Sequence, residues 1–311
     1  MTRTFTMDEP DTRNRLDDML QGVIGTPCDR LDGAAKVTGT ATYAAEYQIE
    51  GCLDAVLVTA TIAKGEVTDI DEASVLRMPG VIAVLCDPRM TTRSAQGGAG
   101  KAPTQNPQEI DYYGQPVALV VAESFEQARH AAKYLKISYR EDSDAVFDPH
   151  VAAAPVEEQT GKSEIKGNLD RAMREAEHAV DVTYTTEGHN SAPMEPHAAM
   201  AQWDGETLTV HLSMQMLKYN VKELADAVGL KPQNVRLISR YVGGGFGSKL
   251  GIAAEAVAAS LAAMALNRPV RAVMLRQQVF QSVMRRSETS QRLRLAAKAD
   301  GRLAGFGHEA L

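Results

Sequence analysis

The sequence is poor in cysteine. Its three cysteines, Cys28, Cys52 and Cys86, lie far apart and form no CxxC pair. An odd number of separated thiols argues against a disulfide framework and against a thiolate metal site. We therefore expect free thiols, mostly in apolar surroundings, in a protein of a reducing compartment.

The sequence also lacks a long hydrophobic run. Its longest apolar stretch, residues 252–266, contains Glu255 and is too short to span a bilayer. The first residues are polar and charged, without the apolar segment of a secretory signal or a twin arginine. We expect a soluble cytoplasmic protein with no membrane partner. Export to the periplasm together with a partner subunit is the alternative.

Basic residues are outnumbered by acidic ones. The chain has 33 Lys and Arg against 40 Asp and Glu, which gives a formal net charge of -7. This composition excludes the dense basic face that nucleic-acid binding requires. The chain has 311 residues, of which 44% are hydrophobic. That is enough for two domains and a large buried core.

The first half of the sequence predicts a mobile arm followed by a compact α+β unit. Residues 1–25 are rich in Asp, Arg and Thr and form the arm. Residues 26–142 form the unit, and residues 143–166 are the linker that follows it. The unit is predicted to contain strands at 53–62, 81–86, 116–122 and 136–140. Its two predicted helices, at 71–78 and 125–135, are capped by Asp71 and Ser124. A loop is predicted at 91–106.

The second half, residues 167–311, predicts another α+β unit. Its expected elements are helices at 169–178, 218–228 and 252–266, strands at 179–188, 235–242 and 270–275, two strands around Asp204–Gly205, and a hairpin at Asp300–Gly301. The return strand of that hairpin ends with the sequence. Because an open strand edge is a liability, we expect a further segment to complete it, as in a truncated or split subunit. A stable monomer with a cooperative melt and no partner would contradict this expectation.

The most unusual feature is a glycine turn at residues 243–247, followed by Ser248 and Lys249. Glycines allow positive φ and a close approach of the backbone to a ligand, and the N–H groups of the next helix can bind an anion. A P-loop is rejected because the order after Gly247 is Ser-Lys instead of Lys-Ser/Thr. A dinucleotide fingerprint is weak because Ser248 replaces a glycine and Arg268 stands where an acid is needed. A tight strand-to-helix connection stays open.

His189, Glu195 and His197 lie within one short segment and invite interpretation as a metal site. Their spacing fits no helical zinc motif, and three ligands on one short loop are difficult to converge. We expect Glu195 and His197 to belong to a pocket-side loop or to brace it.

Together with several other motifs, the glycine turn resembles the xanthine dehydrogenase/aldehyde oxidase family. Its sequence, GGGFGSK, is similar to the GGGFGGK turn of that family. The other matching stretches, in family order, are Arg30–Gly33 with Lys36–Gly39, Gly114–Ala118, Met194–His197, Ser213–Gln215 and Asn267–Val270. The resemblance covers nearly all of residues 26–311 and is closest to the molybdenum-binding subunit of bacterial aldehyde-oxidising members.

The resemblance implies an α+β fold, with an α/β hammerhead domain at 26–142 and the start of the first molybdopterin-binding domain at 167–311. It implies a molybdopterin cofactor, commonly in the cytosine dinucleotide form, and oxidation of an electrophilic carbon with water-derived oxygen. Electrons would leave through iron–sulfur clusters and FAD. This chain has no cysteine pattern for such clusters, so both groups are expected on partner subunits.

The resemblance also assigns individual residues. Gln215 matches the glutamine that hydrogen-bonds near the apical molybdenum oxygen. Gly244, Gly245, Phe246 and Gly247 match the segment whose backbone approaches the metal, and the Phe246 ring closes the substrate pocket. We place Glu195 and Leu250 at that pocket too.

Two departures from the family pattern carry information. Purine-oxidising members have a glutamate where this chain has Leu250, so we expect an aldehyde substrate instead of xanthine. The family's catalytic base lies in a segment beyond Leu311, so no residue of this chain is assigned as the base and the isolated chain is expected to be inactive. A shortened, non-catalytic interaction module is the alternative. An NAD-dependent dehydrogenase rests on the glycine turn alone.

Overall fold

A computed structural model describes residues 27–90, 108–148 and 163–311 of the chain. The predicted arm at 1–25, the loop at 91–106 and most of the linker at 143–166 lie outside the described residues. The chain divides after Ala41 into two units. In the first, the described elements comprise the short helix α1 (Gly33–Val37). All other elements belong to the second unit, residues 42–311.

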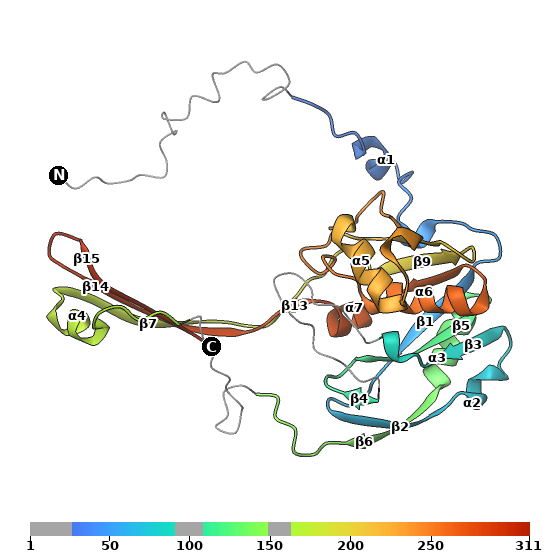
Figure 1. Cartoon of the computed structure of the whole chain (residues 1–311), viewed down its shortest axis with the longest axis horizontal. Coiled ribbons are helices and arrows are strands. Elements are labelled where there is room, and N and C mark those ends of the chain that lie inside the picture. The colour runs from blue at the N-terminus through green and yellow to red at the C-terminus, as the bar shows by residue number, and fades with distance from the viewer. Residues whose placement is uncertain (1–26, 91–107, 149–162) are drawn as a thin grey trace. The chain divides into compact units, whose positions relative to one another are not determined.

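The core of the second unit is a seven-stranded mixed sheet (Figure 1). In spatial order its strands are β11 (Val235–Ile238), β10 (Leu208–Leu212), β9 (Ala198–Trp203), β12 (Val270–Val273), β1 (Leu53–Thr59), β5 (Pro116–Ala122) and β3 (Val81–Leu85). β1 pairs in parallel with β12 and antiparallel with β5. One continuous sheet therefore contains strands from both halves of the sequence.

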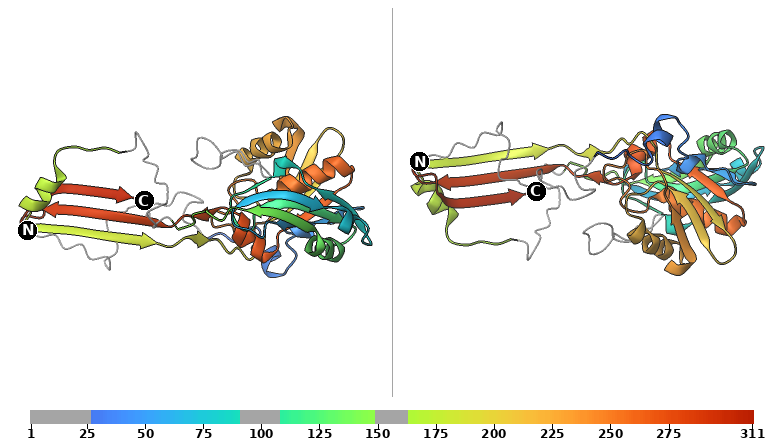
Figure 2. Two further views of the ribbon diagram at one scale, coloured as in Figure 1. Left: turned by 90° about the horizontal axis from the view of Figure 1, so that it is seen from below. Right: turned by 90° about the horizontal axis from the view of Figure 1, so that it is seen from above.

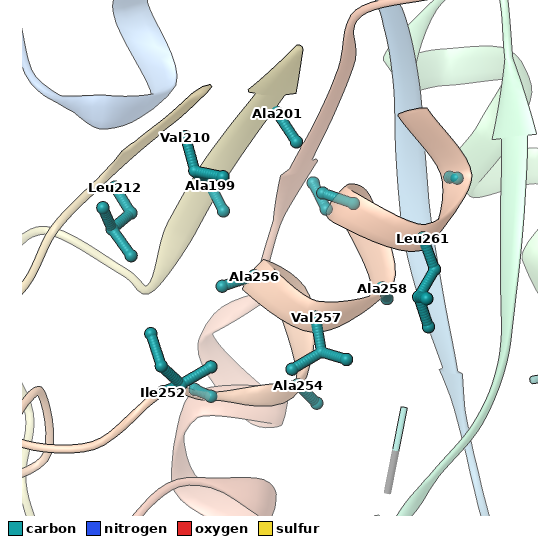
Figure 3. Close-up of a cluster of buried hydrophobic side chains, with 14 of the residues drawn as sticks. Ala199, Ala201, Val210, Leu212, Ile252, Ala254, Ala256, Val257, Ala258 and Leu261 are labelled. Carbon is teal, nitrogen blue, oxygen red and sulfur yellow. The ribbon is translucent and has the colours of Figure 1, made fainter. Parts of the chain in front are cut away.

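The central strands are buried, as their apolar sequences predict. Every residue of β5 is buried, which confirms the expectation from its continuous apolar run. Helix α6 (Ala254–Leu266) packs on β9 and β12, and its residues 254–263 are all buried. Figure 3 shows its small side chains beside those of β9 and β10, including Ala256 near Ala199 and Val210. Small side chains allow the helix to lie close to the sheet.

Helix α3 (Phe125–Tyr134) packs against β1 and β5 and begins at the predicted cap. The Ser124 Oγ accepts a hydrogen bond from the Gln127 N–H at 3.3 Å. Asp71 accepts from the Ser74 N–H at 3.1 Å, at the start of α2 (Ala73–Leu76). Ser124 is therefore the predicted cap of α3, whereas the N-cap position of α2 is Glu72 and Asp71 bonds to the helix from one residue earlier.

Several elements differ from the prediction. A second sheet, β4 (Glu109–Ile110), β2 (Gly65–Asp71) and β6 (Lys136–Glu141), includes β2, where no strand was expected. Helix α7 (Arg276–Ser282) was not predicted either. β11 ends at Ile238 instead of 242 because the chain leaves the sheet before the glycine turn. Shorter elements are η2 (Ala44–Glu46), η3 (Pro88–Met90), η4 (Pro232–Asn234), β8 (His189–Asn190) and β13 (Arg285–Arg286).

The predicted hairpin is confirmed, and it belongs to a three-stranded antiparallel sheet (Figure 2). Its strands are β15 (Leu303–Ala310), β14 (Thr289–Ala297) and β7 (His178–Thr186). Helix α4 (Leu169–Glu175) packs on it and ends before the predicted residue 178, which belongs to β7. A Cβ on Gly307 would lie 2.3 Å from Leu169 Cδ2, so glycine allows this helix to approach.

The cysteines are less buried than expected. Cys28 and Cys86 are exposed, Cys52 is partly buried, and all three are free. The expectation of apolar surroundings is therefore wrong for two of the three, which lie in short connections outside the core. Within the described ranges, no helix combines the length and apolar character needed to cross a bilayer.

Candidate functional site

The glycine turn connects β11 to α6 and has an unusual backbone. Gly244, Phe246 and Gly247 have φ angles of 101°, 53° and 94°. Phe246 is one of two non-glycine residues with positive φ in the described part of the chain. An aromatic residue in this region is strained and is held there by its surroundings. The turn is therefore shaped by more than the local preference of its glycines.

Gly243 and Gly245 are required for space. A Cβ on Gly243 would lie 2.5 Å from Glu195 Cβ, and a Cβ on Gly245 would lie 2.4 Å from Gln215 Oε1. The turn thus packs between two side chains that come from distant parts of the sequence. A tight connection alone does not account for these two glycines.

The predicted anion site at a helix N-terminus is not formed by this turn. α6 begins at Ala254, and residues 248–253 separate it from Gly247. The Ile252 N–H instead donates to Glu223 Oε2 at 3.0 Å. The helix expected at 252–266 therefore begins two residues later than predicted.

Gln215 lies between β10 and helix α5 (Leu217–Val228), and one hydrogen bond to the turn and two to Lys249 just after it hold the residue. Its N–H donates to the Lys249 carbonyl at 2.8 Å, and its Oε1 accepts from the N–H groups of Gly247 at 3.1 Å and Lys249 at 3.3 Å. Because the amide oxygen faces two donors, the orientation of the amide is fixed. Gln215 is an exposed residue.

Phe246 and Leu250 are the two large apolar residues in and just after the glycine turn. The Phe246 ring is 65% exposed, while its carbonyl accepts from Ser191 Oγ at 3.2 Å and Arg286 Nη1 at 3.4 Å. Leu250 is half-buried, and its carbonyl accepts from Asn220 Nδ2 at 2.9 Å. The main chain is therefore anchored at both positions.

Glu195 was predicted for the substrate pocket, and the structure places its carboxylate behind the turn. Its side chain is only 10% exposed. Oε2 accepts from the Gly243 N–H at 2.7 Å, from Ser213 Oγ at 2.5 Å and from Lys249 Nζ at 3.0 Å. The role of Lys249 and Ser213 in this network was missed by sequence reasoning. A lysine directly after a glycine run is the signal that could have drawn attention to it.

The site contains two basic groups whose ionisation is shifted by burial. Burial lowers the pKa of Lys249, whereas the adjacent Glu195 carboxylate raises it. Burial also lowers the pKa of His197 to about 4. His197 Nε2 lies 3.0 Å from the Ser248 carbonyl, so this nitrogen carries the proton and donates. Nδ1 is buried and has no hydrogen-bond partner within the described ranges.

The metal interpretation of His189, Glu195 and His197 finds no support in their placement. His189 is exposed on β8, while Glu195 and His197 are engaged with Lys249 and Ser248. Among the residues that the structure describes, no group of three or more His, Cys, Asp or Glu side chains could hold a metal ion. Glu195 and His197 instead brace the turn, as the sequence suggested.

Comparison with known proteins identifies both halves of the chain. A sequence model of the molybdopterin cofactor-binding domain matches residues 154–311. A model of the aldehyde oxidase and xanthine dehydrogenase a/b hammerhead domain matches residues 38–143. The aldehyde oxidoreductase molybdenum-binding subunit PaoC of Escherichia coli is 38% identical, over 97% of this chain and 41% of that subunit. The 6-hydroxypseudooxynicotine dehydrogenase complex subunit gamma of Paenarthrobacter nicotinovorans is 31% identical, over 93% and 39% respectively.

A solved structure gives the same result. The aldehyde oxidoreductase from Desulfovibrio gigas superimposes with a TM-score of 0.73 at 27% identity, over 90% of this chain and 33% of that one. The fold class expected from the sequence is thus confirmed. The chain spans about two fifths of the length of the curated relatives that it matches, 41% in the case of PaoC.

Proposed function

Because the chain belongs to the molybdopterin cofactor-binding family of aldehyde oxidases and xanthine dehydrogenases, we propose that it contributes one wall of a molybdenum hydroxylase active site. The complete enzyme oxidises aldehydes, or a related electrophilic carbon, with oxygen derived from water. The observation that carries this proposal is the contact between the glycine turn and Gln215. At this place the glycines leave the backbone without side chains, and in this proposal the Gln215 amide directs a donor outward.

The residues of the turn fit a molybdopterin cofactor. A Cβ on Gly245 would lie 2.4 Å from Gln215 Oε1, and that oxygen accepts from the Gly247 N–H. We propose that the Nε2 donors of the same amide face away from the turn. We propose that Gln215 and the segment Gly244–Gly247 hold the cofactor, in the cytosine dinucleotide form. Preorganised N–H dipoles of this kind favour negatively charged oxygen atoms without reorganisation.

When bound, the cofactor supplies the two-electron oxidation of the substrate carbon. The chain's own residues bind and orient. Gln215 donates from Nε2, and its Oε1 keeps the Gly247 and Lys249 N–H groups in place. The exposed Phe246 ring forms an apolar wall that orients a planar or acyl group and excludes water.

We also propose, from what is expected of the same family, which further cofactor-binding segment and which partner subunits complete the enzyme. The catalytic base, the later pterin-binding loops and the electron-transfer groups come from outside these 311 residues. Iron–sulfur and FAD subunits receive the electrons, and the assembled enzyme works in the cytoplasm. In this proposal residues 26–142 form the hammerhead domain, 143–166 the linker and 167–311 the first molybdopterin-binding domain.

The test is metal analysis of the chain purified together with the products of neighbouring genes. We expect stoichiometric molybdenum and a pterin released on denaturation. A folded complex that contains neither would contradict the proposal. It would favour the alternative of a folded interaction module without catalysis.

The substrate class is a prediction that rests on Leu250. An apolar residue cannot hydrogen-bond the polar edge of a purine, and leaving that edge unpaired costs binding energy. We therefore expect the assembled enzyme to turn over benzaldehyde faster than xanthine in a steady-state assay with an artificial electron acceptor. Faster turnover of xanthine would contradict the prediction. Leu250→Glu should shift the ratio of the two kcat/KM values toward xanthine.

A further inference from the structure

We propose that Lys249, Glu195 and Ser213 form a buried clamp that positions the glycine turn and, through it, the amide of Gln215. The clamp residues do not reach the exposed face of the turn, so they are positioning residues and not catalytic ones. This inference rests on the proposed function for its biological meaning. The geometry of the clamp itself does not depend on any cofactor.

The clamp fastens both ends of the turn to one residue. At the first end, the Gly243 N–H donates to Glu195 Oε2 at 2.7 Å, and the Glu195 N–H donates to the Gly243 carbonyl at 3.1 Å. At the other end, Lys249 Nζ lies 3.0 Å from Glu195 Oε2 and 2.9 Å from the Glu195 carbonyl. Glu195 therefore holds Gly243 and Lys249, on the two sides of the turn, at a fixed separation.

The ammonium group of Lys249 is fully satisfied inside the protein. The side chain has 0% exposure, and Nζ donates to the Glu195 carbonyl, to Glu195 Oε2 and, at 2.9 Å, to Ser213 Oγ. These three acceptors use all three donors of an ammonium group. The Ser213 hydroxyl in turn donates to Glu195 Oε2. A buried ion pair of this type adds geometric definition, and loss of one partner leaves the other uncompensated.

Lys249 connects the clamp to Gln215. Its side chain is held by Glu195, while its main-chain N–H and carbonyl both bond to Gln215. A shift of Lys249 therefore moves one donor away from Gln215 Oε1 and leaves the amide held there by the Gly247 N–H alone. In this proposal the buried pair behind the turn thereby restricts the orientation of the Gln215 amide.

The experiment measures the apo chain and uses Lys249→Met, which keeps the length of the apolar stem and removes the ammonium group. The readouts are hydrogen exchange of residues 243–249 and the side-chain amide resonance of Gln215, assigned with Gln215→Ala. We expect exchange in the turn to accelerate at least about tenfold relative to β5, together with a shifted Gln215 amide signal. The matched control is Lys222→Met, which removes an exposed pair with Asp226 on α5. The control should leave both readouts unchanged.

Each outcome decides the inference. Turn protection and a Gln215 signal equal to those of the unmodified chain in Lys249→Met would overturn it. If Lys249→Met does not fold, Ser213→Ala, which removes one acceptor and keeps the ion pair, replaces it with the same readouts. A uniform loss of protection across the chain in Ser213→Ala, with no excess in the turn, also overturns it. Absence of molybdenum from the purified complex would contradict the proposed function and would not affect the interpretation of the hydrogen-exchange result.

Discussion

His197 is the residue whose chemistry gives the clearest dependence on pH. It is 1% exposed, and burial lowers its pKa to about 4 from 6.5. Its Nε2 donates to the Ser248 carbonyl, so protonation would place a new N–H on the buried Nδ1. The folded chain therefore holds the neutral ring.

The prediction concerns acid stability. The contribution of His197 is complete above pH 6.5 and is lost as the pH falls toward 4, because the unfolded chain takes up the proton first. We expect this group alone to reduce the free energy of unfolding by about 1 to 2 kcal/mol between pH 7 and pH 5. Urea denaturation at several pH values measures it. His197→Gln should have a shallower pH dependence, and an equal slope in that variant would contradict the assignment.

At this scale the sequence predicts part of the site. The pattern GGGFGSK and Gln215 could be singled out because glycines and a family motif are visible locally, and the structure brings the two into contact. The clamp could not be predicted, because Lys249 and Glu195 are separated by 54 positions. Lysine is also among the residues least often buried. The usual preference of lysine for the surface therefore argued against the buried position that Lys249 occupies.

The elements differ in how well their sequences identify them. β5 was predicted because a continuous apolar run is typical of a strand buried on both faces. β2 was missed because its sequence, GEVTDID, has few apolar residues and no buried position. α7 was missed because its polar residues gave no strong helical period, although Gln278 and Ser282 are buried. β2 and α7 therefore depend on tertiary packing, which the local sequence pattern does not reveal.

Helix α6 supports a prediction about packing. Ala256 is fully buried where the helix meets the sheet, whereas Ala265 on the same helix is exposed. A larger side chain at 256 would have to push the helix away from β9. We expect Ala256→Leu to lower the free energy of unfolding by about 1–3 kcal/mol. Ala265→Leu is the control and should have little effect in the same denaturation assay. Equal effects would show that helix–sheet packing is not close.

For the whole second unit, the order of the main sheet is decisive. β12 lies between β9 and β1, so the sheet joins the segment matched to the hammerhead with the segment matched to the cofactor-binding domain. Arg271 on β12 strengthens this junction through Asp54 on β1, with an N–O distance of 2.8 Å. Such a sheet cannot be divided between the two segments without exposing the edges of its central strands.

We therefore predict that the strands of the main sheet unfold together. A calorimetric scan should give one main transition for the sheet, and Arg271→Met should lower its midpoint without dividing it. Exchange protection in β5 and in β9 should be lost in the same transition. Separate loss of protection in these two strands would contradict the prediction.

The parallel pairing of β1 with β12 also has a consequence for synthesis on the ribosome. Asp54 and its partner Arg271 are 217 positions apart. At ordinary translation rates, synthesis of the residues between the two strands takes on the order of 10 to 40 s, and during this time the edge of β1 that pairs with β12 has no partner strand. During that interval the nascent chain carries an apolar strand with one side of its backbone unbonded. We therefore expect the folding yield of this chain to depend on the pace of elongation.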